Sequence, residues 1–156
     1  MARAFIGLGA NIGNRQKALR DALRALDHTP GVVVAAQSSF YSTAPVGGPP
    51  QPDYLNAAAE LFTSLGPLQL LHALLGLEAG LGRVRAERWG PRVIDLDLLL
   101  YEDLIVDLPD LVLPHPRMAE RLFVLEPLAE IAPDAIHPVL RRTVGELLAA
   151  RRRPAK

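Results

Sequence analysis

The segment RWGPRVIDLDLLLY, residues 88–101, joins an arginine-rich loop to the pattern of a buried β-strand. Its second half is apolar except for Asp95 and Asp97. Because side chains alternate across a strand, both carboxylates are predicted on one face, about 6.6 Å apart, while Leu96 and Leu98 point into the core. Two carboxylates at that separation repel each other by about 2.5 kcal/mol at an effective dielectric of about 20. We therefore expect a compensating partner beside this strand.

Magnesium suits this pair of acids, because it prefers carboxylate oxygens and commonly shares its coordination shell with substrate phosphates. The alternative is a half-exposed strand whose solvent face carries two acids. Such acids need no metal if nearby arginines pair with them. A D-x-D motif taken alone does not separate the two interpretations.

The loop before the strand carries Arg83, Arg85, Arg88 and Arg92 together with Trp89. Guanidinium groups beside a metal-binding strand would suit a polyphosphate, with metal on one side and planar donors on the other. The alternative is an exposed loop whose arginines pair with neighbouring acids. The residues alone leave both interpretations open.

The composition indicates one globular domain spanning residues 1–156. Hydrophobic residues make up 49% of the chain, and its 17 basic and 17 acidic residues cancel, which argues against non-specific attraction to nucleic acid or membrane. The chain has no cysteine, which excludes thiol chemistry. The N-terminal apolar run is broken by Gly9 and Asn11, so it is neither a signal peptide nor a membrane span, and we expect a cytoplasmic protein.

Hydrophobic periodicity predicts six main elements. They are a strand at 4–9, a helix at 14–27 capped by Asn14, strands at 32–41 and 54–64, a helix at 66–80 and a strand at 93–101. The order β-α-β-β-α-β is typical of a ferredoxin-like α/β fold, an antiparallel sheet with helices on one face. A C-terminal extension of short strands and two short helices follows. GLGANIG at 7–13 is interpreted as a tight strand-to-helix turn, because its spacing does not fit a nucleotide-binding fingerprint.

Three segments together resemble the 6-hydroxymethyl-7,8-dihydropterin pyrophosphokinase family of folate biosynthesis. They are FIGLGANIGN at 5–14, RVRAERWGPRVIDLDLLLY at 83–101 and LPHPRM at 113–118. The resemblance spans nearly the whole chain. It implies the ferredoxin-like fold and transfer of pyrophosphate from ATP to the pterin hydroxymethyl group, which leaves AMP.

The resemblance also implies an ATP site with two magnesium ions held by Asp95 and Asp97. Arg83 and Arg92 would act with these aspartates in catalysis. Leu98 and Val112 would line the adenine pocket. The full set of residues expected to contact ATP is Arg83, Arg85, Trp89, Arg92, Leu98, Val112, His115 and Arg121.

The pterin site implied by the resemblance uses Thr43, Pro45, Val46, Tyr54, Asn56 and Phe123. Tyr54 and Phe123 would sandwich the flat ring, and Asn56 would read its amide edge. Without the resemblance, Tyr54 and Phe123 would be interpreted as core residues. Leu75 departs from the family where some relatives place a polar residue near the nucleotide. The acceptor of the substrate's hydroxyl proton stays open between an aspartate and an oxygen bound to the metal.

Two other classes share the predicted element order. An RNA-recognition module would carry a characteristic aromatic segment that this chain lacks, and acids on its sheet face would repel a phosphate backbone. A small-molecule regulatory module would not need D-x-D beside RWGPR. The expected partners are therefore the small molecules ATP and 6-hydroxymethyl-7,8-dihydropterin, with neither nucleic acid nor membrane.

Overall fold

The computed structural model describes residues 1–44, 53–81 and 94–152. Its main sheet contains β1 (Ala2–Ala10), β2 (Val32–Gln37), β3 (Tyr41–Thr43), β4 (Tyr54–Thr63) and β5 (Asp95–Tyr101). The strand order is β2-β4-β1-β5, with β3 also paired to β4. The pairs in this sheet are antiparallel, and β1 lies between β4 and β5. This arrangement confirms the predicted antiparallel sheet.

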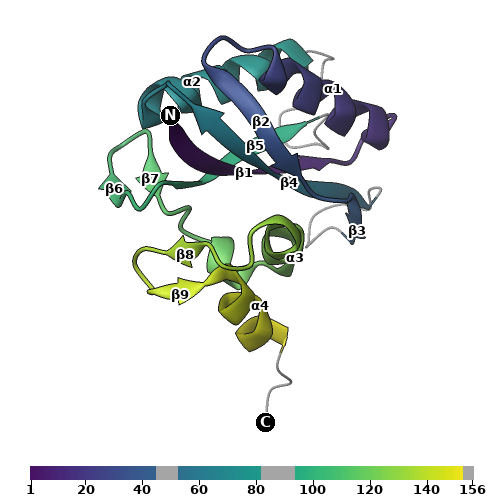
Figure 1. The fold of residues 1–156 in the computed structure, drawn as a ribbon. Helices are drawn as coiled ribbons and strands as arrows, with labels where there is room; N and C mark the ends of the chain where they lie inside the picture. Colours follow the sequence, from purple (N-terminus) through teal and green to yellow (C-terminus); the bar gives the residue numbers. More distant parts are fainter. Residues whose placement is uncertain (45–52, 82–93, 153–156) are drawn as a thin grey trace.

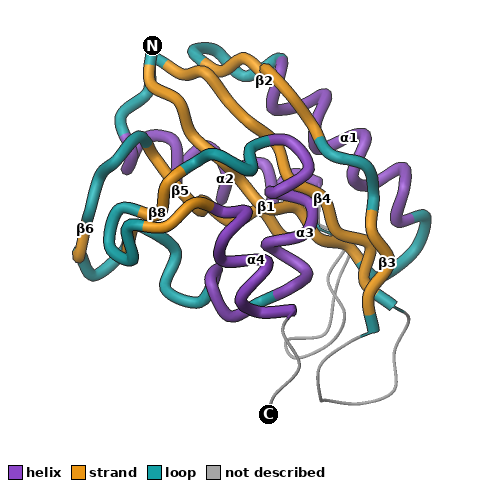
Figure 2. The backbone as a smooth tube through the Cα atoms, turned by 60° about the horizontal axis from the view of Figure 1, so that its bottom comes forward, coloured by secondary structure: helices purple, strands orange, loops and turns teal. Residues whose placement is uncertain are grey.

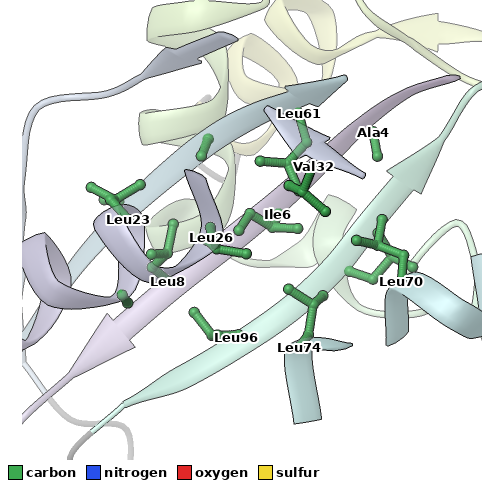
Figure 3. Packing of buried hydrophobic residues seen from close by; sticks show 14 of the residues in the cluster. Ala4, Ile6, Leu8, Leu23, Leu26, Val32, Leu61, Leu70, Leu74 and Leu96 are labelled. Carbon is green, nitrogen blue, oxygen red and sulfur yellow. The ribbon is translucent and has the colours of Figure 1, made fainter. Parts of the chain in front are cut away.

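The first face of the sheet is covered by α1 (Arg15–Asp27) and α2 (Pro67–Leu81), as Figure 1 shows. The predicted cap is present, since the Asn14 side chain accepts a hydrogen bond of 3.1 Å from the backbone N–H of Lys17. Leu23 and Leu26 of α1 and Leu74 of α2 point onto the strands in Figure 3. Their helical spacing explains why the sequence placed both helices correctly.

The second face of the sheet is also covered, which corrects the expectation of helices on one face only. It is packed by α3 (Leu122–Ile131) and α4 (Val144–Arg152), on the opposite side from α1 and α2 (Figures 1 and 2). Phe5, Leu99 and Leu100 of the sheet join Leu125 and Leu128 of α3 in a second buried cluster. The sheet is therefore the middle layer of three.

A register shift lets β5 contribute to both cores. Ile6 pairs with Leu98 and Phe5 pairs with Leu100, so Leu99 is an extra residue in β5. Such a bulge lets two consecutive side chains face one way. Leu99 and Leu100 both pack in the second cluster, whereas Leu98 packs in the first.

The predicted strand at 32–41 is two strands, and this prediction was wrong in its continuity. Residues 38–40 belong to neither strand. Ser38 still contacts β4: its backbone N–H donates a hydrogen bond of 2.9 Å to the Ala58 carbonyl oxygen, and its Oγ accepts one of 2.9 Å from the Ala58 backbone N–H. The remaining elements, apart from the α-helices and the main sheet, are short. They are β6 (Val106–Asp107), β7 (Val112–Leu113), the 3-10 helix η1 (Met118–Glu120), β8 (Ile136–His137) and β9 (Arg142–Thr143).

Within the described ranges, no helix combines the length and apolar character needed to cross a membrane.

Two glycines give stability predictions of opposite sign. Gly31 has φ of +82°, and an added Cβ would lie 2.8 Å from Ser64 Oγ. Gly31→Ala should therefore lower the free energy of unfolding by about 1–2 kcal/mol. Gly76 lies inside α2 with open space around an added Cβ. Gly76→Ala should raise the same quantity by about 0.5–1 kcal/mol, because alanine loses less backbone entropy in a helix. Urea denaturation of the two variants measures both, and a stabilised Gly31→Ala would contradict the left-handed turn.

Candidate functional site

Asp95 and Asp97 lie at the start of β5, on the face of the sheet against which α3 and α4 pack. In the register of β1 and β5, Asp95 is opposite Gly9 and Asp97 is opposite Gly7. Leu96, between the two acids, is buried in the first core. The structure therefore confirms the predicted orientation of this strand.

Two cavities share these aspartates. The larger has a volume of about 1170 Å³ and the smaller about 610 Å³, and both are lined by Asp95 and Asp97. The carboxylates thus stand at the boundary between two binding spaces. A reaction between two bound molecules could take place at such a boundary.

The larger cavity is lined by residues of β1, β3, β4 and β5 and of η1, α3 and α4. Thr43 of β3, Tyr54 and Asn56 of β4 and Phe123 of α3 all line it. Asn56 is buried, and its Nδ2 donates a hydrogen bond of 2.6 Å to Thr43 Oγ1. Arg121 also lines this cavity, with its guanidinium carbon 5.5 Å from the centroid of the Phe123 ring. The cavity therefore combines aromatic walls with a fixed amide and a cation.

Gly7 and Gly9 form part of the floor of the larger cavity. They lie inside β1, as the predicted strand at 4–9 requires, and Gly13, with φ of +65°, lies in the turn that leads to α1. A Cβ at Gly9 would lie only 3.2 Å from Asn56 Oδ1. The absence of side chains at these alternating positions leaves room beside the aspartates. This role was not predicted, although glycine at every second position of a strand was the available signal.

The smaller cavity is lined by Leu98, Val112 and His115, as the resemblance implied for the ATP site. Leu75 lines it as well and is 50% exposed. Glu78 was not anticipated: it lines the cavity, and its Oε2 accepts a hydrogen bond of 2.7 Å from the backbone N–H of Leu96. The apolar side chains offer a surface for a flat base next to the acidic pair.

His115 is oriented by the backbone on both sides. The backbone N–H of His115 donates a hydrogen bond of 2.9 Å to the Leu99 carbonyl oxygen. Its Nδ1 faces the backbone N–H of Arg117 at 3.3 Å. Because Nδ1 accepts there, the neutral ring carries its hydrogen on Nε2, which can donate to an anion. Burial lowers the pKa of His115, Asp97 opposes this by raising it, and Arg121 and Arg117 lower it further.

Several predicted residues fall in ranges that the structure does not describe. They are Pro45, Val46, Arg83, Arg85, Trp89 and Arg92, and their roles stay predictions. The other predicted residues all line one or both cavities. The larger cavity also holds Arg117, Glu120, Glu126 and Arg151, which sequence analysis did not single out. Arg151 lies on α4, far along the chain, and no local pattern linked it to the site.

The electrostatic surroundings of His115 give a prediction that requires no activity. Its pKa should lie below 6.5 in the ligand-free protein. Asp97→Asn removes the interaction that raises this pKa, so the pKa should fall further; Arg117→Gln removes a repulsion, so the pKa should rise. NMR titration of the imidazole in the presence of a chelator measures both shifts.

The same shift has a consequence for stability. Because the folded-state pKa of His115 lies below 6.5, the unfolded chain binds the proton first as the pH falls. The contribution of His115 to stability should therefore decline from about pH 6.5 downward. For the NMR titration, His115 pKa shifts of the same sign in Asp97→Asn and Arg117→Gln would contradict the causes assigned to the lowered pKa.

Comparison with known proteins shows which family this chain resembles. Residues 5–133 match the family model described as 7,8-dihydro-6-hydroxymethylpterin-pyrophosphokinase (HPPK). A 2-amino-4-hydroxy-6-hydroxymethyldihydropteridine pyrophosphokinase of Methylorubrum extorquens is 51% identical over 149 residues, covering 96% of this chain and 93% of that protein. One of the same name from Bacillus subtilis is 50% identical over 128 residues, covering 82% and 77%.

The fold is also found among solved structures. Wild-type HPPK-DHPS of Plasmodium falciparum, solved with pteroate, superposes with a TM-score of 0.76 at 14% identity. The match covers 96% of this chain and 42% of that longer chain. At this identity the likeness shows the fold alone, whereas the sequence matches show the family. The chain belongs to the 7,8-dihydro-6-hydroxymethylpterin-pyrophosphokinase family.

Proposed function

We propose that this chain transfers pyrophosphate from ATP to the hydroxymethyl group of 6-hydroxymethyl-7,8-dihydropterin in folate biosynthesis. The products are AMP and the pterin diphosphate. The single observation that carries the proposal is the aspartate pair shared by two cavities. A transfer between two substrates requires their reacting atoms to meet, and this boundary is the place for them. We further propose that residues 1–156 act as one cytoplasmic domain on these two small molecules.

The larger cavity is the proposed pterin site. Tyr54 and Phe123 offer ring faces to a flat bicycle, and such contacts contribute about 0.5–1.5 kcal/mol beyond area burial. Because Asn56 Nδ2 is bonded to Thr43, the amide presents Oδ1 as the acceptor for an N–H of the pterin edge. Pro45 and Val46 are proposed for the same site from the sequence resemblance.

The smaller cavity is the proposed nucleotide site. Leu98, Val112 and Leu75 provide apolar surface for adenine. His115 would donate from Nε2 to a phosphate oxygen, and Arg121 would approach the phosphates from the larger cavity. Arg83, Arg85, Trp89 and Arg92 are proposed for ATP from the sequence resemblance.

The donor set of the aspartate pair fits magnesium. Asp95 and Asp97 provide hard carboxylate oxygens, and the described residues contain no group of three or more acidic, histidine or cysteine side chains able to hold a metal. Magnesium commonly takes one or two carboxylates and completes its shell with water and substrate phosphates. We propose that Asp95 and Asp97 hold two ions with ATP. Bound magnesium supplies neutralisation of phosphate charge.

The chain's own residues then position the reactants. The pterin hydroxyl oxygen forms a bond to the β-phosphorus, the bond from that phosphorus to the α,β-bridging oxygen breaks, AMP leaves, and the hydroxyl proton is released. Tyr54 and Phe123 fix the plane of the ring, and Asn56 fixes its rotation in that plane. Phosphoryl transfer is accelerated mainly by such positioning and by electrostatic stabilisation. Arg83 and Arg92 are proposed to neutralise charge as the transfer proceeds.

Replacing Asp97 tests the reaction. Asp97→Asn should lower AMP formation by at least about 100-fold, because an amide oxygen is a poor magnesium ligand. The fold should persist and the ligand-free protein should melt at the same or a higher temperature, since one repelling charge is removed. AMP would be measured from ATP and hydroxymethyl-dihydropterin, with and without magnesium.

The matched control is Asp107→Asn, which neutralises an exposed acid of β6 outside the lining of both cavities. It should keep full activity. Near-normal activity in Asp97→Asn would refute the metal-binding role. A wild-type protein that forms no AMP under any of these conditions would refute the proposed function.

Replacing Phe123 tests the division between the cavities. Phe123→Ala should weaken pterin binding by about 1–3 kcal/mol, the scale of losing an aromatic stacking partner. ATP binding should hardly change, because Phe123 lines the larger cavity only. Isothermal titration with each ligand measures both. Phe62→Ala, at an exposed aromatic outside both cavities, is the control. Equal losses for the two ligands would show that Phe123 acts as a core residue instead.

A further inference from the structure

Glu130, in the last turns of α3, holds the segment that joins β2 to β3. Its carboxylate accepts hydrogen bonds from the Ser39 backbone N–H at 2.9 Å, the Ser39 hydroxyl at 3.1 Å and the Tyr41 hydroxyl at 2.6 Å. We call Glu130, Ser39 and Tyr41 the Glu130 clamp. One carboxylate thus links two elements that lie some 90 residues apart in sequence.

The clamp leads directly into one wall of the larger cavity. Tyr41 is the first residue of β3 and pairs with Asn56, and Thr43 pairs with Tyr54. Tyr41 and Thr43 share a face because side chains alternate along a strand. Thr43 Oγ1 accepts the hydrogen bond that orients the Asn56 amide. Any shift of β3 would therefore move the group that fixes Asn56.

The clamp is also connected to the opposite wall of the larger cavity, which Phe123 lines. Phe123 lies seven residues before Glu130 on α3, which is close to two full turns, so both side chains leave the helix on the same side. Glu126, between them, lines the larger cavity with Phe123. The carboxylate of Glu130 therefore ties the helix that carries Phe123 to the strand that carries Thr43.

The charge states of the clamp favour these bonds near neutral pH. The Tyr41 hydroxyl and the Ser39 backbone hold the pKa of Glu130 below its ordinary value. The same bond to Glu130 raises the pKa of Tyr41 to about 12. A neutral phenol donating to an ionised carboxylate forms a short, strong hydrogen bond. Glu130 is exposed, so we expect the clamp to affect local geometry more than global stability.

We propose that Glu130 and Tyr41 are positioning residues for the pterin site, which set the spacing between the Thr43–Asn56 wall and Phe123. This inference rests on the proposed function of the larger cavity. Neither residue lines that cavity. They act by holding its two walls at the spacing of a flat ring, which lowers the ordering cost of binding.

The test uses the full chain with Tyr41→Phe and Glu130→Gln. Each should raise the dissociation constant for hydroxymethyl-dihydropterin about fivefold to tenfold, the effect of losing one charge-assisted hydrogen bond. ATP affinity should stay within about twofold, because no residue of β3 lines the smaller cavity. KM for pterin should rise while kcat at saturating pterin stays nearly unchanged. The double variant should be no worse than the worse single variant, since both changes act on the same bond: Tyr41→Phe removes its donor and Glu130→Gln removes the charge of its acceptor.

The matched control is Glu146→Gln. Glu146 also accepts a hydrogen bond from backbone, at 2.9 Å from Thr143 N–H, but it lies in the first turn of α4 and lines neither cavity. Its pKa is likewise lowered by bonds from Thr143. Glu146→Gln should leave pterin affinity unchanged. It therefore separates a local effect on the site from a general effect of removing a bonded carboxylate.

Three results would overturn the proposal. Pterin affinity could be unchanged in both clamp variants, or pterin and ATP could weaken equally, or Glu146→Gln could weaken pterin as much as Glu130→Gln. A wild-type protein that binds ATP without binding pterin would refute the proposed function, and the clamp's role with it, before any variant is compared. A wild-type protein that binds both, with a selective loss of pterin in the two clamp variants, supports both proposals.

Discussion

The register between β1 and β5 is the constraint on which the rest of the site depends. It sets Gly7 opposite Asp97 and Gly9 opposite Asp95, while Leu8 and Leu96 pair on the other face in the core. A slip of one residue would turn both carboxylates into an apolar core, at a cost of several kcal/mol for each buried charge. The same alternation that buries the leucines therefore delivers the acids to the cavities. Core and site are specified by one pattern.

The bulge at Leu99 explains how one strand serves three environments. Before the bulge, Asp95 and Asp97 face the cavities and Leu98 faces the first core. After it, Leu99 and Leu100 face the second core under α3 and α4. Without the extra residue, Leu100 would keep the parity of Leu98 and point to the first core. The helices α3 and α4 can therefore pack on the sheet immediately beside the cavities that the two aspartates line.

Sequence patterns predicted those parts of the fold that are specified locally. Period-two alternation located β5 and β4, and helical spacing with the Asn14 cap located α1. The break between β2 and β3 was missed because the contacts made there, from Ser39 to Glu130 and from Ser38 to Ala58, join residues distant in sequence. The second helical layer was missed for a similar reason: the face of a helix does not say which side of a sheet it covers. Tertiary contacts decide that side.

The candidate site was predictable to the extent that its residues lie in recognisable motifs. Strand geometry predicted that Asp95 and Asp97 share one face, whereas their interpretation as metal ligands came from family resemblance. His115, Val112 and Phe123 came from family resemblance, since a lone histidine or phenylalanine indicates no particular role. Arg151 and the Glu130 clamp lacked such signals, and the alternating Gly7 and Gly9 of the cavity floor carried a signal that was not used. Their roles depend on how α3, α4 and β3 meet around one cavity, which only the folded chain shows.

The packing of α3 and α4 on the sheet also distinguishes the proposed enzyme from an RNA-recognition module of the same strand order. Such a module stacks bases on an open sheet face. Here Phe5, Ala58 and Leu100 of that face are buried beneath α3 and α4. The part of this face that lines a cavity carries Gly7, Gly9 and two carboxylates, which would repel a phosphate backbone but can hold a metal that attracts one. Among the described residues, the face beneath α3 and α4 therefore offers no continuous platform for a nucleic acid strand. The cavity lined by Tyr54, Phe123 and the two acids suits the flat ring and the phosphates that we propose for it.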